Sequence, residues 1–142
     1  MRSRLIAAIL LLLASPLGLQ AGTANLGTCE TSVGAWEFAT TSGGRLLVAR
    51  KGPGATYDVV WVAKFANSDT GDIEPEGVAA ECTCANAATK LVWKCRVLFS
   101  LQYLRIGSHQ TYEWSSDGDT LKSWYIAPEG KRNEGLPIRR PH

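Results

Sequence analysis

Four cysteines carry the most reactive side chains of this chain, and three of them lie close together. Cys82, Cys84 and Cys95 fall in one short stretch, and Cys29 lies far upstream. Four thiols can form two disulfides or a four-cysteine zinc site. Zinc sites usually place about two to four residues between paired cysteines, whereas a single residue separates Cys82 from Cys84. The spacing therefore favours two disulfides and predicts no metal site.

Alternation of polar and apolar residues predicts that residues 78–99 form a hairpin of two antiparallel strands joined near 86–90. Cys82 and Cys84 then point to the same side of one strand, so a bond between them would be strained. Cys95, on the other strand, lies opposite one of the two. We predict the pairs Cys82 with Cys95 and Cys29 with Cys84, and the alternative exchanges Cys82 and Cys84 between these pairs.

Residues 1–24 have the three regions of a secretory signal peptide: two arginines, an apolar run over 5–14 and small residues around 21–24. We predict cleavage after Ala24, with Ala21 as the alternative. The apolar run is shorter than the ~20 residues that span a bilayer, so we expect no membrane anchor. We therefore expect a secreted or periplasmic protein, in agreement with disulfides. Lipidation of Cys29 is a rival, because residues 26–29 loosely resemble a bacterial lipobox.

Removal of the predicted signal peptide changes the charge of the chain. The sequence has 15 Lys and Arg against 13 Asp and Glu, and the loss of Arg2 and Arg4 leaves 13 of each. A chain close to neutral lacks the basic surface that nucleic acids require, so we expect no nucleic-acid partner.

Short alternating runs separated by Gly, Pro and Asp turns continue over residues 25–127, and no segment has a convincing helical period. This pattern predicts one all-β domain, an antiparallel meander barrel of seven or eight strands, with a β-sandwich as the alternative. Residues 128–142 have three prolines and no period, and we expect a tail. The expected strands are 33–38, 45–51, 56–65, the hairpin 78–99, 109–115 and 119–127, with 101–106 ambiguous and 67–77 an acidic loop.

Aromatic side chains gather on one face of several expected strands. In the strand 56–65, Tyr57, Trp61 and Phe65 share a face, while Asp58 and Lys64 mark the other. In the second strand of the hairpin, Trp93 and Phe99 share a face with Cys95. In a closed barrel these faces would form the interior.

Gly34-Ala35-Trp36, at the start of the first expected strand, resembles the Gly-x-Trp opening of lipocalins and related calycin barrels, and the turn at 116–121 is similar to that of small bacterial lipocalin-like domains. The resemblance implies a barrel whose narrow end is closed by Trp36. It also implies an internal pocket for a ligand.

A barrel of about eight strands is either filled by its side chains or holds one small ligand. We predict that it binds a small apolar or aromatic molecule, with Tyr57, Tyr112 or His109 as the candidate polar groups at the mouth. For His109 a surface position is the favoured alternative, because its candidate partner Glu113 lies about 13 Å away along the strand.

The alternative is a filled barrel that binds a protein, such as an extracellular hydrolase to be inhibited, through loops 42–44 and 66–77 and the tail. The motifs of common enzymes are absent, so we expect neither catalysis nor a cofactor. The predicted ligand-binding residues are Tyr57, Trp61, Trp93, Tyr112 and Trp114.

Overall fold

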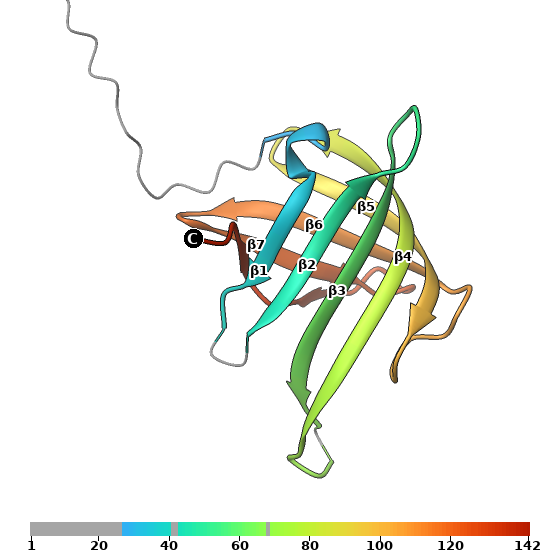
Figure 1. The fold of residues 1–142 in the computed structure, drawn as a ribbon, viewed down its shortest axis with the longest axis vertical. Helices are drawn as coiled ribbons and strands as arrows, with labels where there is room; N and C mark the ends of the chain where they lie inside the picture. The colour runs from blue at the N-terminus through green and yellow to red at the C-terminus, as the bar shows by residue number, and fades with distance from the viewer. Residues whose placement is uncertain (1–26, 41–42, 68) are drawn as a thin grey trace, which may run out of the picture.

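The computed structural model describes residues 27–40, 43–67 and 69–142, so the predicted signal peptide lies outside the described residues. These residues form a closed antiparallel barrel of eight strands (Figure 1), which confirms the predicted barrel rather than the sandwich. No helix in the described part of the chain is long and apolar enough to cross a membrane. The elements are η1 (Glu30–Ser32), β1 (Gly34–Phe38), β2 (Gly44–Arg50), β3 (Thr56–Ala66), β4 (Ile73–Ala87), β5 (Lys90–Ser100), β6 (His109–Asp117), β7 (Thr120–Ile126), β8 (Arg132–Glu134) and β9 (Ile138–Arg139).

The C-terminal segment closes the barrel. Strands β1 to β7 pair with their neighbours in chain order, and β9 lies between β7 and β1. Ile138 is paired with both Phe38 and Leu121, and β8 pairs with the other end of β7. The predicted tail at 128–142 is therefore part of the barrel wall. Sequence alternation does not reveal it, because β8 and β9 have only three and two residues.

One predicted loop is partly wrong, and one segment that the sequence left ambiguous is a loop. Strand β4 begins at Ile73, which pairs with Ala66, so half of the expected acidic loop belongs to the sheet. Residues 101–106 form a loop rather than a strand. The backbone N–H groups of Leu101, Gln102 and Tyr103 donate to a buried carboxylate, that of Glu76, and that of Leu101 also donates to the carbonyl of Gly77 on β4.

A bulge in β5 turns Phe99 out of the barrel. Ala79 pairs with Phe99 and Ala80 with Val97, so Leu98 is an extra residue on the β5 side. An extra residue reverses the faces of the positions that follow it. Phe99 is consequently 52% exposed, and its predicted place inside the barrel is wrong.

Aromatic rings fill the end of the barrel next to η1, which we call the closed end. Trp114 lies between two other indoles, with ring centroids 5.7 Å from Trp36 and 4.9 Å from Trp93. Tyr57 packs edge-on against Trp93 at 5.5 Å. The indole N–H of Trp36 donates to the carbonyl of Ser32 in η1 at 2.8 Å. This hydrogen bond fixes η1 across the end of the barrel.

Both predicted disulfides are confirmed. Cys82 and Cys95 are directly opposite on β4 and β5. Cys29 is bonded to Cys84 and ties the chain before η1 to β4. All four sulfurs belong to buried residues, so the bonds are part of the closed end of the core.

Arg140 covers the closed end from outside. Its guanidinium lies 3.8 Å from the ring centroid of Trp36 and donates to the carbonyls of Thr31, Val33 and Ala35. These carbonyls belong to η1 and to the chain leading into β1, so one side chain joins both ends of the described chain. Gly34 makes this approach possible, because a Cβ there would lie 3.0 Å from a guanidinium nitrogen of Arg140.

Replacement of Arg140 with alanine is expected to lower the free energy of unfolding by about 2 kcal/mol, since a cation–π contact and partly exposed charged hydrogen bonds are lost. Arg140→Lys should lose about half as much, because the charge remains and the planar fork does not. Urea unfolding measures both values. The control is Arg139→Ala, which removes a surface ion pair with Glu37 and should cost less than 1 kcal/mol, as such pairs contribute about 0 to 1 kcal/mol. If Arg139→Ala and Arg140→Ala lowered the free energy of unfolding equally, Arg140 would not be the residue that holds the two ends of the described chain together.

Candidate functional site

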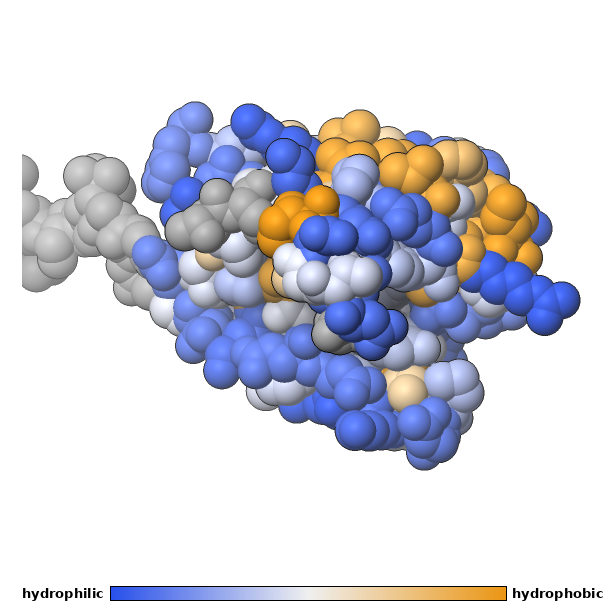
Figure 2. Space-filling model, turned by 90° about the horizontal axis from the view of Figure 1, so that it is seen from below, coloured by the Kyte–Doolittle hydropathy of each residue, from blue (hydrophilic) through white to orange (hydrophobic). Residues whose placement is uncertain are grey.

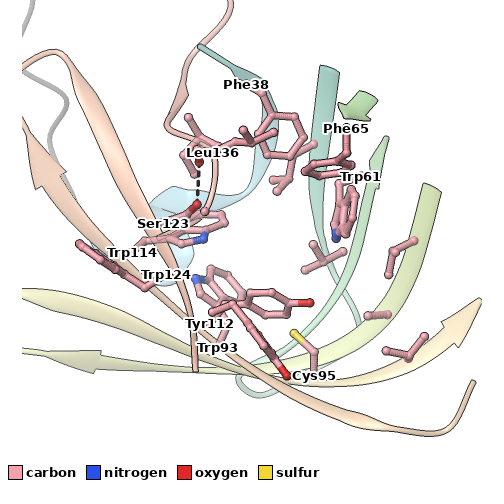
Figure 3. A pocket seen from close by; sticks show the side chains of 18 residues that line it. Phe38, Trp61, Phe65, Trp93, Cys95, Tyr112, Trp114, Ser123, Trp124 and Leu136 are labelled. Carbon is pink, nitrogen blue, oxygen red and sulfur yellow. Dashed lines mark hydrogen bonds between the residues drawn. The ribbon is translucent and has the colours of Figure 1, made fainter. Parts of the chain in front are cut away.

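An apolar cavity of about 150 Å³ lies inside the barrel, next to the aromatic rings that fill the closed end. Figure 3 shows the rings of Trp61, Trp93 and Tyr112 around this space, with Phe38 and Phe65 at the top of the view. Aliphatic side chains from β2 to β5 and from β9 also line the cavity, and they are Leu46, Val59, Val78, Ala80, Val97 and Ile138. The other lining residues are Cys95, Trp114, Ser123, Trp124, Tyr125, Gly135 and Leu136. An apolar cavity of this size can hold a single aromatic ring.

Four of the five predicted ligand-binding residues line this cavity, namely Trp61, Trp93, Tyr112 and Trp114. Tyr57 does not line it. The ring of Tyr57 is fully buried against Trp93, and its hydroxyl donates to Glu30 at 3.2 Å. The structure therefore places Tyr57 in the core of the closed end.

His109 does not lie at the mouth. It is an exposed residue at the start of β6, paired with Arg96 on the outer face of the sheet. The inward positions of β6 are instead Gln110, Tyr112 and Trp114, since side chains alternate along a strand. The exposed position confirms His109 as the expected surface histidine rather than a polar group of the mouth.

Further aromatic residues of the cavity were not among the predicted site residues. Phe38 and Phe65 contact Trp61 edge-on, with centroid distances of 6.3 and 6.1 Å. Their strand alternation already places them on inward faces.

Leu136 comes from the segment between β8 and β9, and its carbonyl accepts a hydrogen bond from the Ser123 hydroxyl at 2.6 Å. No strand period could reveal Leu136, because it lies outside the strands.

The cavity continues into a wider recess of about 470 Å³, and both spaces share Trp61, Phe65, Tyr112 and Tyr125. The recess lies where β3 meets β4 and where the loop 101–108 leaves β5, and we call this end the mouth. Its further lining residues are Ala66, Asn67, Asp69, Glu76, Tyr103, Leu104 and Gln110. The site is thus a small apolar chamber with a larger and more polar entrance.

Glu76 holds one side of the mouth. Its carboxylate is 2% exposed and accepts hydrogen bonds from the backbone N–H groups of Gly77, Leu101, Gln102 and Tyr103. Burial would raise the pKa of Glu76, but these donors outweigh burial and keep its pKa below the usual value. The charged carboxylate therefore fixes the loop after β5.

The electrostatic character of the chamber is neutral. Among its described lining residues there is no Asp, Glu, His, Lys or Arg. Burial raises the pKa of Tyr112 to about 12, so its hydroxyl keeps its proton at neutral pH. The indole N–H of Trp124, which lines the chamber, has no acceptor among the described residues, and neither has the buried indole N–H of Trp93. A bound oxygen within reach of either N–H would complete its hydrogen bonding.

Comparison of the chain with protein-family models, with curated proteins and with solved structures finds no match.

Proposed function

We propose that this protein is a non-catalytic carrier, of lipocalin-like character, that binds one small uncharged apolar or aromatic molecule inside the barrel. The observation that carries the proposal is the aromatic chamber of about 150 Å³, open to a wider mouth. A filled barrel, which the alternative of a protein-binding module implies, would leave no such space. Secretion or export to the periplasm fits the two disulfides, which persist in oxidising compartments.

The lining limits the chemistry of the ligand. A charged group in the chamber would lose its hydration without gaining an opposite charge, which is costly. Aromatic walls favour a flat ring, because stacked and edge-on contacts add to the burial of apolar area.

The Ser123 hydroxyl already donates to Leu136, and no histidine or carboxylate of the described lining could take its proton. This arrangement supports binding rather than nucleophilic catalysis.

Toluene, ethylbenzene and acetophenone are suitable probes, because each carries one ring. At a concentration ten times its Kd, a bound probe should stabilise the protein by about 1.4 kcal/mol. The midpoint of thermal unfolding should then rise by about 5 °C. Toluene and ethylbenzene should also shift the tryptophan emission. Acetophenone tests the unpaired N–H groups of Trp93 and Trp124, since its shape is close to that of ethylbenzene and it adds a carbonyl acceptor.

The matched variants are Ala80→Phe and Ala85→Phe, on the same strand. Ala80 lines the chamber, whereas Ala85 lies exposed on the outer face of β4. We expect Ala80→Phe to abolish the thermal shift and Ala85→Phe to retain it, with the unfolding midpoint without ligand reporting that both variants fold. Absence of any shift with the wild-type protein, or an undiminished shift with Ala80→Phe, would rule out binding in the chamber.

A further inference from the structure

An apolar strip runs across the outer wall of the barrel, on the side opposite to the chamber lining. Leu47, Val60, Ala79 and Phe99 are register partners on β2, β3, β4 and β5, so they form one continuous row. Val62 lies beside this row on β3, opposite Gly77. We call these five residues, Leu47, Val60, Val62, Ala79 and Phe99, the outer strip. Its large side chains are 45 to 52% exposed.

The outer strip has no cover among the described residues. Figure 2 shows apolar residues gathered on the upper side, which is the side of the wall that faces the viewer in Figure 1. A shallow groove lies over the wall at Ala35, Arg45, Leu47, Val60 and Val62. A half-buried strand normally carries polar residues on its solvent face, and a continuous apolar patch there marks a contact surface.

Charges flank the outer strip in a fixed order. The outward positions of β3 are Asp58, Val60, Val62 and Lys64, so an acid and a base stand at equal distances from two valines. Lys64 is exposed and has no ion pair among the described residues, and Asp58 is 4.0 Å from Lys51. One side of the strip is therefore acidic on β3 and the other side is basic.

The neighbouring strands repeat this order. Arg45 pairs with Val62 and lies on the basic side, where its nearest carboxylate oxygen is 4.0 Å away on Glu37. Glu81 pairs with Asp58 and lies on the acidic side, where it forms ion pairs with Lys51 and Arg96. A surface with one acidic and one basic border complements a copy of itself turned by 180°.

We propose that the outer strip is the contact face of a symmetric dimer of this protein. The two-fold axis lies between the two facing walls, parallel to both of them and perpendicular to β3, and it crosses β3 between Val60 and Val62. It places β3 antiparallel to β3 of the second copy. Asp58 then faces Lys64 of the second copy, and Lys64 faces its Asp58, as an isologous interface requires. The same rotation places Ala79 over Gly77 of the second copy, and Leu47 over the side chain of Arg45 of the second copy.

The size of the strip sets the strength of this contact. Four strands spaced at about 4.8 Å and seven residues rising about 3.3 Å each cover roughly 400 Å² of wall per copy. Interfaces below about 1,200 Å² in total belong to weak, transient complexes. The fraction of dimer should therefore rise as the protein concentration is raised. The contact should leave the mouth of the barrel free. This inference is independent of the proposed ligand.

Sedimentation velocity of the purified protein over a range of concentrations tests the dimer. We expect a shift from monomer towards dimer, and Val62→Lys should weaken it at least about tenfold, because a charge replaces apolar contact. Asp58→Lys and Lys64→Asp should each weaken it about tenfold. The double variant Asp58→Lys/Lys64→Asp exchanges the two charges and should restore the wild-type affinity to within about threefold.

The control is Lys94→Asp, which reverses an exposed charge on β5 away from the outer strip and should leave the dimer unchanged. Thermal unfolding checks that each variant is folded. A wild-type protein that stays monomeric at every soluble concentration overturns the proposal, as does a dimer that persists in Val62→Lys. If the single charge variants weaken the dimer and the double variant does not restore it, the two-fold arrangement is wrong.

Discussion

Loss of the disulfide between Cys29 and Cys84, by replacement of both with alanine, is expected to lower the free energy of unfolding by about 4 kcal/mol. The bond joins residues 55 positions apart, so it restricts a long loop of the unfolded chain. On the chain-entropy relation a loop of that length accounts for the expected value. The bond also secures η1, whose Ser32 carbonyl accepts the indole N–H of Trp36.

The matched comparison is Cys82→Ala/Cys95→Ala, which opens a loop of 13 positions and should cost about 3 kcal/mol. Denaturant unfolding of both double variants, against the oxidised wild-type protein, gives the two values. We expect the longer loop to matter more, by about 1 kcal/mol. A smaller loss for the Cys29 and Cys84 pair would show that the N-terminal segment is dispensable for the closed end.

Glu76→Gln is expected to destabilise the protein by about 3 kcal/mol at neutral pH. Its carboxylate is buried beneath four backbone N–H donors, and an amide of the same shape presents its own NH₂ group to donors that need an acceptor. The control is Glu74→Gln on the same strand, whose carboxylate contacts side chains of Tyr103 and Asn67. This variant should lose less than 1 kcal/mol.

The effect of Glu76 should depend on pH in one direction. The pKa of this carboxyl in the folded protein lies below its value in the unfolded chain, about 4.3, so its contribution is complete above that pH. Protonation removes the contribution as the pH falls through the lower, folded value. The difference in unfolding free energy between wild type and Glu76→Gln should therefore be constant from pH 7 to about 5 and shrink in more acidic solution. A difference independent of pH would mean that the charge of Glu76 is not what holds the loop.

The sequence predicted the interior where strands alternate without interruption. Tyr57, Trp61, Cys82 and Trp93 follow a period of two and are held on one face by the burial of that face. The same rule limited the partner of Cys95 to Cys82 or Cys84, because the centre of a hairpin determines which residues are opposite. The choice between Cys82 and Cys84 remained open at that stage, since it depends on a shift of one register position.

Phe99 and Tyr57 show why the rest could not be predicted, whereas His109 is on the surface as expected. One extra residue at Leu98 reverses the face of Phe99, and the position of a bulge depends on pairing across two strands rather than on local pattern. Tyr57 points into the barrel, as predicted. Its position along the barrel axis places it in the packed core of the closed end rather than in the lining of the cavity. His109 falls on the outer face because the register of β6 against β5 places it opposite Arg96.

By itself the sequence determined an all-β chain with two disulfides and an aromatic interior, because alternation, turn residues and cysteine spacing are local properties. Tertiary structure alone decided that the C-terminal segment closes the barrel, that Arg140 seals Trp36, and that a chamber remains between the rings. The physical reason is that closure joins the two ends of the chain, and the volume left inside depends on how all eight strands stagger around the axis. Neither the closure of the barrel nor the volume of the chamber can be read from any single segment of the sequence.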